Sequence, residues 1–406
     1  MVGCCAQKRA PVPGPPAARE GDDMRFRPEL TSTWLVGVTA ACLLCVLLAT
    51  GQIAAQEKPL MSDQVFKNIQ VLKGIPVDEF MGTMGFFSAA LSLNCTECHA
   101  AEALNDLSEY ATDTPIKQTA RKMVLMVRGI NQAYFGGKAV ITCYTCHRTS
   151  AVPKSVVSLI EQYGTPVDDP NEAELLKNPA PGIPTPDQIF DKYIAAIGGA
   201  QKLAAITSYT AKGTYVGFDT SDQKAPLEVY AKAPGQSTII VHAKLGDVIK
   251  TFDGRSGWNA VVHGLYPLLP LSGGDLDGAR FDASLFFPAE IKQSLTNWQS
   301  GFSSTAIDDR QVQVVQGMTA SKTPIKLYFD AESGLLVREV RYRPTAVGPI
   351  PTQIDYSDYR EVSGVKEPFH WVMTWTDGKS TADLTQVQLN MPVDGSKFNK
   401  PDVTAK

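Results

Sequence analysis

The sequence predicts an α+β multidomain protein with three structural parts: an N-terminal transmembrane or signal helix, an α-helical domain, and an antiparallel β half-barrel-like domain with a covering helix. Three observations lead to this prediction. An uncharged apolar run lies near the N-terminus, and two Cys-x-x-Cys-His motifs follow it in a region of helical patterning. The second half of the chain alternates apolar and polar residues with a period of two, which is typical of strands.

Length and composition agree with several globular domains. The 406 residues are 44% hydrophobic, 8% aromatic and 20% charged, which is close to the globular average and excludes a polytopic membrane protein. The 38 basic and 42 acidic residues give a formal net charge of −4, so no overall positive field exists to hold a polyanion. We therefore expect no nucleic-acid partner.

The N-terminal segment is expected to place the rest of the chain outside the cytoplasm. Residues 1–30 form a predicted disordered cytoplasmic tail, and the uncharged residues 31–56 form the predicted transmembrane or signal segment. Basic residues precede this segment and Glu57 follows it, so the positive-inside rule directs the bulk of the chain to the periplasm or extracytoplasmic space. We expect a single helix anchored in the cytoplasmic membrane, although small residues after the apolar run leave signal-peptide cleavage open.

Two motifs in residues 57–177, the predicted α-helical domain, carry its chemistry. The members of the two Cys-x-x-Cys-His sequences are Cys95, Cys98 and His99, and Cys143, Cys146 and His147. Two thiols three positions apart on a helical turn reach the two vinyl groups of one porphyrin, and the adjacent imidazole then binds the iron. With eight cysteines and five histidines in the chain, a chance match is expected about 0.002 times. The pattern predicts two covalently bound c-type haems; the alternatives are one zinc site built from both motifs, or two disulfides.

A pair of methionines precedes each motif on a predicted helix. The two pairs are Met81 with Met84, and Met123 with Met126. The first helix is predicted over Val77–Phe87, and the second opens with Thr114 as N-cap and Pro115 at the first helical position. Methionine opposite histidine gives a closed, electron-transferring iron, whereas an empty position permits ligand chemistry. Both members of a pair share one helix face, so the spacing alone does not choose between them.

From about residue 60 to residue 155 the chain resembles the multihaem cytochrome c subunit of photosynthetic reaction centres. The stretches Ala120–Asn131 and Val140–Arg148 carry the resemblance around the second motif, and Glu79–His99 is similar more loosely around the first. This resemblance implies an electron-transfer function. It also implies that the first methionine of each pair is the axial ligand, namely Met81 and Met123.

The chain departs from that family in its number of haem motifs. The family carries four haems, whereas this sequence has no third or fourth Cys-x-x-Cys-His and no histidine in residues 131–135. Two haems are therefore expected. Several basic residues lie near the motifs, and Arg148 directly follows His147. We therefore expect Arg148, in preference to the others, to pair with a haem propionate through its guanidinium.

A proline-rich linker, residues 178–186, separates this region from the predicted β domain, residues 187–406. A helical pattern that begins at Asp187 and ends at a glycine C-cap, Gly198 and Gly199, opens the β domain, and a second helix is predicted over Ala283–Trp298. The ten predicted strands are Tyr209–Phe218, Leu227–Ala233, Ser237–Ala243, Val248–Phe252, Val312–Met318, Ile325–Phe329, Leu335–Arg343, Ile354–Tyr359, Phe369–Trp375 and Ala382–Asn390. Ten antiparallel strands with a covering helix indicate a strongly curved sheet or half-barrel.

Two stretches of the β domain, Tyr328–Arg338 and Asp358–His370, resemble the exported lipoprotein-localisation-factor superfamily, whose half-barrel holds acyl chains. The resemblance implies a lipid-like ligand for this domain. The sequence contains no nucleophile elbow, phosphate loop or clustered metal site, and its remaining histidines are scattered, so no catalytic residues are predicted.

These patterns favour a membrane-tethered dihaem cytochrome that carries single electrons between extracytoplasmic donor and acceptor proteins, with a membrane redox complex as one candidate partner. Two other classes of function stay open. One is a dihaem peroxidase or related oxidoreductase in which one iron lacks its methionine. The other is a sensor in which the β domain binds a lipid or another ligand and the haems report it. The coordination of the iron separates a carrier from an enzyme.

Overall fold

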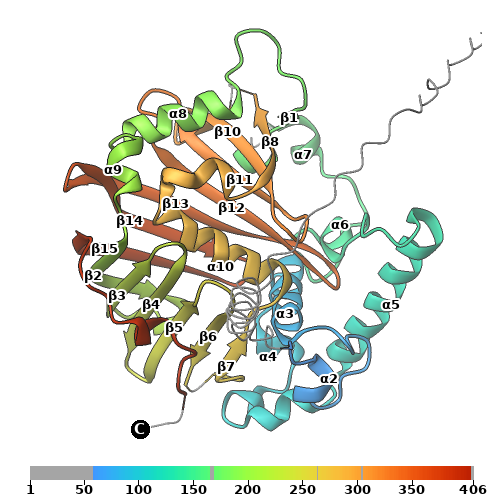
Figure 1. Cartoon of the computed structure of the whole chain (residues 1–406). Coiled ribbons are helices and arrows are strands. Elements are labelled where there is room, and N and C mark those ends of the chain that lie inside the picture. Colours follow the sequence, from blue (N-terminus) through green and yellow to red (C-terminus); the bar gives the residue numbers. More distant parts are fainter. Residues whose placement is uncertain (1–57, 165–168, 263, 303–304, 404–406) are drawn as a thin grey trace, which may run out of the picture. The chain divides into compact units, whose positions relative to one another are not determined.

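The computed structural model describes residues 58–164, 169–262, 264–302 and 305–403 (Figure 1). The described residues belong to one compact unit, Gln56–Lys406. The predicted tail and the predicted apolar segment, residues 1–30 and 31–56, lie outside the described residues. Within the described part of the chain, no helix has the length and apolar character needed to cross a bilayer.

Residues 58–164, here called the motif segment, are mainly helical. Their elements are α2 (Ser62–Val65), α3 (Val77–Leu91), α4 (Cys95–Cys98), η1 (Ala101–Leu104), η2 (Leu107–Ala111), α5 (Pro115–Phe135), α6 (Cys143–His147) and α7 (Leu159–Tyr163). The predicted start of α5 is confirmed, because the Thr114 side chain accepts a hydrogen bond from the Lys117 amide and Pro115 occupies the first turn. The helix ends at Gly136, whose φ of 60° suits a residue without a side chain.

One large sheet makes up most of the remaining chain, with antiparallel pairing between neighbours. Its strands are β1 (Leu175–Leu176), β2 (Ser208–Gly217), β3 (Ala225–Lys232), β4 (Gln236–Ala243), β5 (Gly246–Phe252), β6 (Gly257–Val261), β7 (Leu268–Pro270), β8 (Thr296–Gly301), β9 (Ala306–Ile307), β10 (Arg310–Met318), β11 (Pro324–Asp330), β12 (Leu336–Thr345), β13 (Gly348–Val362), β14 (Val365–Trp375) and β15 (Gly378–Leu389). All ten predicted strands are confirmed within a few residues. The order is β1-β8-β10-β11-β12-β13-β14-β15-β2-β3-β4-β5-β6-β7, and β9 pairs with β10. The order brings the two ends of the β region together, because β15 pairs with β2.

Helices cover one face of the curved sheet, as Figure 1 shows for α8, α9 and α10. They are α8 (Pro186–Ala196), α9 (Ala200–Ala204), α10 (Gly273–Leu285) and the 3-10 helix η5 (Pro288–Gln293). The largest core cluster joins α8, η5 and the inner residues of β10 and β11, with Phe190 of α8 at 0% exposure. The predicted helix at the start of the β domain is therefore confirmed, and the structure shows that it covers the sheet.

The prediction of a helix over Ala283–Trp298 is wrong. The long helix lies earlier, at Gly273–Leu285, and the chain has already entered β8 at Thr296. Pro288 explains the break, because it lacks an amide hydrogen and opens a separate 3-10 turn. The start of α10 was not predicted because Gly273 and Gly274 are poor helix formers. At Gly274 the chain packs tightly against β12, since a Cβ on this residue would lie 2.8 Å from Arg343 Cβ.

The motif segment packs directly on the sheet. A core cluster combines Phe86 and Ala90 of α3 with Val347 and Ile350 of the β12–β13 hairpin. Gly348, at the tip of that hairpin, has a φ of 149°, and a Cβ on it would lie 2.9 Å from the Phe86 ring. The hairpin therefore reaches the motif helices closely, at a position that only glycine fits.

The central role of Phe190 gives a test of this core. Its ring makes edge contacts with Trp298 and Phe329, at centroid distances of 4.8 and 5.8 Å. Phe190→Ala should lower the free energy of unfolding by about 3–5 kcal/mol, because it leaves a cavity in the packed interior. Phe218→Ala is the control, since that ring is 62% exposed, and it should cost much less. Equal losses in urea denaturation for both variants would contradict the described core.

Candidate haem-binding site

The first motif forms a short capped helix, α4. The side chain of Asn94 accepts hydrogen bonds from the amides of Thr96 and Glu97, and the Glu97 carboxylate accepts one from the Asn94 amide. This reciprocal cap stabilises the single helical turn on which the two cysteines lie three residues apart. Cys95 is exposed, whereas Cys98 is half-buried, and burial raises the pKa of the Cys98 thiol.

His99, at the end of α4, has one ring nitrogen fixed by the backbone. Its Nδ1 lies 3.1 Å from the carbonyl oxygen of Tyr110, whose ring meets the imidazole edge-on at 5.0 Å between centroids. A carbonyl can only accept, so Nδ1 carries the hydrogen and Nε2 keeps its lone pair. Burial, followed by the charge of Lys117, lowers the pKa of His99, which favours the neutral imidazole that a metal requires.

The second motif repeats this arrangement on α6. Thr142 caps the helix by accepting a hydrogen bond from the Thr145 amide, and Nδ1 of His147 lies 2.9 Å from the carbonyl oxygen of Ser150. The imidazole therefore again presents Nε2. Cys143 is buried in the cluster that contains Phe86, and burial raises its pKa to about 11, whereas Cys146 is exposed.

The four methionines differ in their surroundings. Met84 is half-buried and packs against the core cluster that joins α3 to the β12–β13 hairpin. Met81 is half-buried as well, but it is not among the residues packed against that cluster. On α5, Met123 is half-buried and Met126 is 45% exposed. The helices that carry these pairs lie near the motifs, because α6 packs against α3 and α5, and α4 packs against α5.

The donors present fit c-type haem better than the two alternatives. The four motif cysteines are free thiols in the described structure, so neither pair forms a disulfide. No group of three or more His, Cys, Asp and Glu side chains converges as a metal site within the described residues. Each motif instead offers two thiols and one imidazole nitrogen. Exposed apolar side chains of the motif segment could cover a macrocycle, among them Leu104, Leu107, Leu125 and Met126.

The basic residues near the motifs differ in their contacts. Arg121 pairs with Asp113 at 2.8 Å, and Nη1 of Arg128 donates to the carbonyl oxygen of Val71. Nη2 of Arg121 also donates to the carbonyl oxygen of Asn68 at 3.2 Å, so both arginines bind the chain that precedes α3. Arg148 is exposed and has a φ of 47°, directly after His147. Its expected contact with a haem propionate stays a prediction.

Asn131 has a structural role near the second motif that the sequence analysis missed. Its side chain is 7% exposed, and its Nδ2 donates to the carbonyl oxygen of Ile141 at 2.7 Å. Its Oδ1 accepts from the amides of Val140 and Ile141 at 3.2 and 2.9 Å. One side chain thus joins the end of α5 to the loop before Cys143. An asparagine late in an apolar helix face was the only signal in the sequence.

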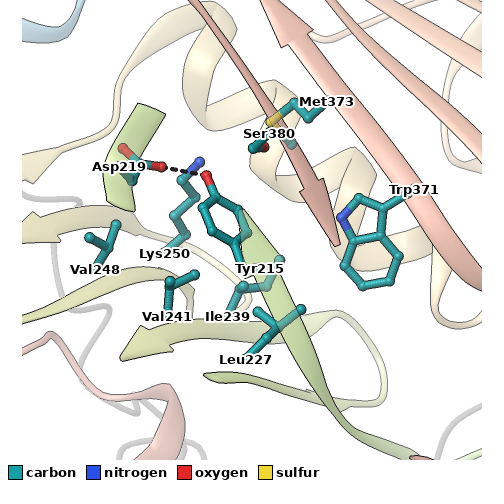
Figure 2. A pocket seen from close by; sticks show the side chains of 10 residues that line it. All are labelled: Tyr215, Asp219, Leu227, Ile239, Val241, Val248, Lys250, Trp371, Met373 and Ser380. Atoms are coloured by element: carbon teal, nitrogen blue, oxygen red, sulfur yellow. Dashed lines mark hydrogen bonds between the residues drawn. The ribbon is translucent and has the colours of Figure 1, made fainter. Parts of the chain in front are cut away.

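The β domain contains a small cavity on the inner side of β2 to β5, β14 and β15. Figure 2 shows its lining, in which the Tyr215 hydroxyl donates to Asp219 beside Lys250, and apolar residues such as Val241 and Trp371 fill the rest. Its volume is about 30 Å³, which holds one or two water molecules. An acyl chain does not fit this cavity as described.

The contacts of Asn131 predict a local effect of its removal. Asn131→Ala should lower the free energy of unfolding by about 1–3 kcal/mol, because two amides and one carbonyl lose a buried partner. The amide hydrogens of Val140 and Ile141 should also exchange faster. Gln132→Ala is the control, since Gln132 is exposed, and it should change stability by less than about 0.5 kcal/mol. Unchanged hydrogen exchange in Asn131→Ala would contradict the described role.

Comparison with known sequences supports the resemblance of the motif segment. Residues 45–179 match the family model described as the photosynthetic reaction centre cytochrome C subunit. A photosynthetic reaction center cytochrome c subunit of Rubrivivax gelatinosus is 33% identical over 119 residues, 26% of this chain and 31% of the relative. The corresponding subunit of Thermochromatium tepidum is 34% identical over 106 residues, 25% of each chain. This chain thus spans less than a third of the length of these relatives.

Solved structures resemble the β domain at low sequence identity. A LolA superfamily protein from Nitrosomonas europaea has a TM-score of 0.36 and 13% identity, covering 53% of this chain and 98% of that one. A DUF1329 family protein from Desulfovibrio piger has a TM-score of 0.37 and 9% identity, covering 52% of this chain and 96% of that one. The comparisons therefore confirm that the motif segment of this chain is similar to the cytochrome c subunit of photosynthetic reaction centres.

Proposed function

We propose that this protein is an extracytoplasmic c-type cytochrome with two covalently bound haems that carries single electrons between redox partners. The observation that carries the proposal is the repeated geometry of the two motifs. In each, a capped turn presents two thiols, and the imidazole that follows has its Nδ1 on a backbone carbonyl and its Nε2 available. Cys95, Cys98 and His99 would hold one haem, and Cys143, Cys146 and His147 the other.

Met81 and Met123 are the proposed second ligands of the two irons. The different surroundings of Met81 and Met84 support the first assignment, because Met84 is engaged in the core cluster and Met81 is not among its members. The resemblance of the motif segment to the cytochrome c subunit of photosynthetic reaction centres implies the first methionine in both pairs. When bound, haem supplies a reversible one-electron iron couple. The chain's own residues fix the imidazole tautomer of His99 and His147, and Met81 and Met123 would supply the thioethers.

The partners and location follow from the same similarity and from the N-terminal sequence. The relatives are subunits of photosynthetic reaction centers, so we propose donor and acceptor proteins that include a membrane redox complex. Residues 31–56 would hold the chain at the cytoplasmic membrane, with the haems on the periplasmic side. Arg148 would pair with a propionate of the second haem.

A lipid-like ligand of the β domain is a separate proposal. The apolar part of the lining in Figure 2 supports it, and because the cavity volume is about 30 Å³, the strands that line it would have to move apart before an acyl chain could enter. Lipid that copurifies with the protein and shifts a haem midpoint potential would support this ligand. Purification without any bound lipid would count against it.

Coordination of the two irons distinguishes a carrier from a peroxidase. If both irons have histidine and methionine ligands, the oxidised protein should show only low-spin haem, and the reduced protein should bind carbon monoxide slowly at both sites. Optical and electron paramagnetic resonance spectra of the purified protein measure this directly. A high-spin component, or one haem that binds carbon monoxide quickly, would favour the oxidoreductase alternative.

The methionine assignment has its own test on α5. Leucine keeps the side-chain volume but lacks the sulfur, so Met123→Leu should remove the sulfur-to-iron charge-transfer band of one haem and lower its midpoint potential. Met126→Leu is the matched control three residues along the same helix, and it should leave both unchanged. If Met126→Leu removes the band and Met123→Leu keeps it, the second methionine of the pair is the ligand.

A further inference from the structure

The helix that carries Met81 is fixed to the β domain along one stripe. Asp78, Gly82 and Gly85 lie four and three residues apart on α3, which places them on one face of the helix. All three are buried. A Cβ on Gly82 would lie 2.6 Å from the guanidinium nitrogens of Arg343, and one on Gly85 would lie 2.7 Å from Thr376 Oγ1. The helix therefore touches β-domain residues without intervening side chains of its own.

The N-terminal end of this stripe is anchored by a buried carboxylate. Asp78 is 3% exposed, and its two carboxylate oxygens accept hydrogen bonds from the amide and the hydroxyl of Ser272. Ser272 precedes α10 in the β domain. A buried carboxylate with two donors is costly to displace, so α3 cannot slide along its axis without leaving these donors.

Arg343 joins the centre of the stripe to α10. This residue of β12 pairs with Asp275 of α10 at 2.6 Å, and its Nη1 lies 3.4 Å from the carbonyl oxygen of Asp78. Its planar guanidinium lies over Gly82, where any side chain would displace it. Gly82 directly follows Met81 in the chain. The position of this guanidinium therefore sets how closely α3 approaches β12 at Met81.

We propose that Arg343 of the β domain is a positioning residue for the Met81 ligand of the first haem. The inference rests on the proposed haem function and extends it, because it makes the β domain part of the coordination geometry of one iron. The pair Arg343–Asp275 and the flat surface of Gly82 hold α3 against the sheet, and this contact fixes where the Met81 thioether can lie. The methionine of the second haem is on α5, so the Arg343 contact does not position that ligand, although Cys143 of the second motif packs in the cluster that α3 shares with the β12–β13 hairpin.

Two substitutions at this contact can be paired with matched controls. Gly82→Ala forces the guanidinium away from α3, and Arg343→Lys keeps the charge but loses the planar fork. Gly129→Ala controls the first, because Gly129 lies within α5, the other methionine-bearing helix, and a Cβ there meets nothing within 4 Å. Arg338→Lys controls the second, because Arg338 lies on the same strand and pairs with Asp355 of the neighbouring strand β13.

The experiment is made in the full-length, haem-loaded Met123→Leu protein, in which the remaining sulfur-to-iron band reports the first haem. We expect Gly82→Ala and Arg343→Lys to weaken that band and to lower the midpoint potential of the first haem, with the potential of the second haem unchanged. Gly129→Ala and Arg338→Lys should keep the band and both potentials. Because Arg343→Lys adds no volume, it tests the contact even if Gly82→Ala does not fold.

The outcomes separate this inference from the function on which it rests. A band and potentials identical to those of Met123→Leu in both Gly82→Ala and Arg343→Lys would overturn the role of Arg343 and leave the dihaem function standing. Equal shifts of both haems would also overturn it, because general destabilisation does not select one iron. If Met123→Leu alone already lacks any sulfur-to-iron band, Met81 is not a ligand, and the role of Arg343 falls with the Met81 assignment while the two covalently bound haems still stand.

Discussion

The packing of α3 against the sheet is the contact on which the arrangement of the motif segment depends. Phe86 and Ala90 of this helix pack in one cluster with Val347 and Ile350 of the β12–β13 hairpin. Cys143 of the second motif lies in the same cluster. One interface therefore places the first methionine helix and the second haem motif together. Short helices of this size bury too little apolar surface to be stable alone, so the sheet supplies the surface that they lack.

Backbone groups complete the site in a way that side-chain motifs do not reveal. Both motif histidines use a carbonyl, that of Tyr110 or of Ser150, to fix the imidazole. Near the first motif, the Tyr110 carbonyl also accepts from Nζ of Lys117 at 2.8 Å, so one backbone oxygen holds both a ligand candidate and the start of α5. A fixed tautomer reduces the reorganisation that accompanies a change of iron charge, which suits an electron carrier.

Local sequence signals were sufficient to predict many of the helices and strands of this molecule. The capped start of α5 at Thr114, the helix α8 and the ten main strands were predicted from their own residues, since capping and period-two patterns act within a few positions. The same holds for the motif cysteines and histidines. The assignment of Met81 and Met123 came from family resemblance, because the residue pattern alone allowed either member of each pair.

Features that depend on distant residues were not predictable. Helix α10 begins at two glycines, of which Gly274 is explained only by its packing against Arg343, and Asp78 finds its donors 194 residues away at Ser272. The carbonyl partners of His99 and His147 were hidden for another reason, since every residue type carries a carbonyl. Short edge strands such as β7 and β9 contain too few residues for a periodic pattern.

The mass of the intact purified protein tests the central claim most directly. If both motifs bind haem through their cysteines, the denatured chain should carry the mass of two haem groups after non-covalent cofactors have been extracted. Replacing both cysteines of one motif by alanine should remove one of the two. A chain that carries no added mass after expression with its own maturation machinery would contradict the account.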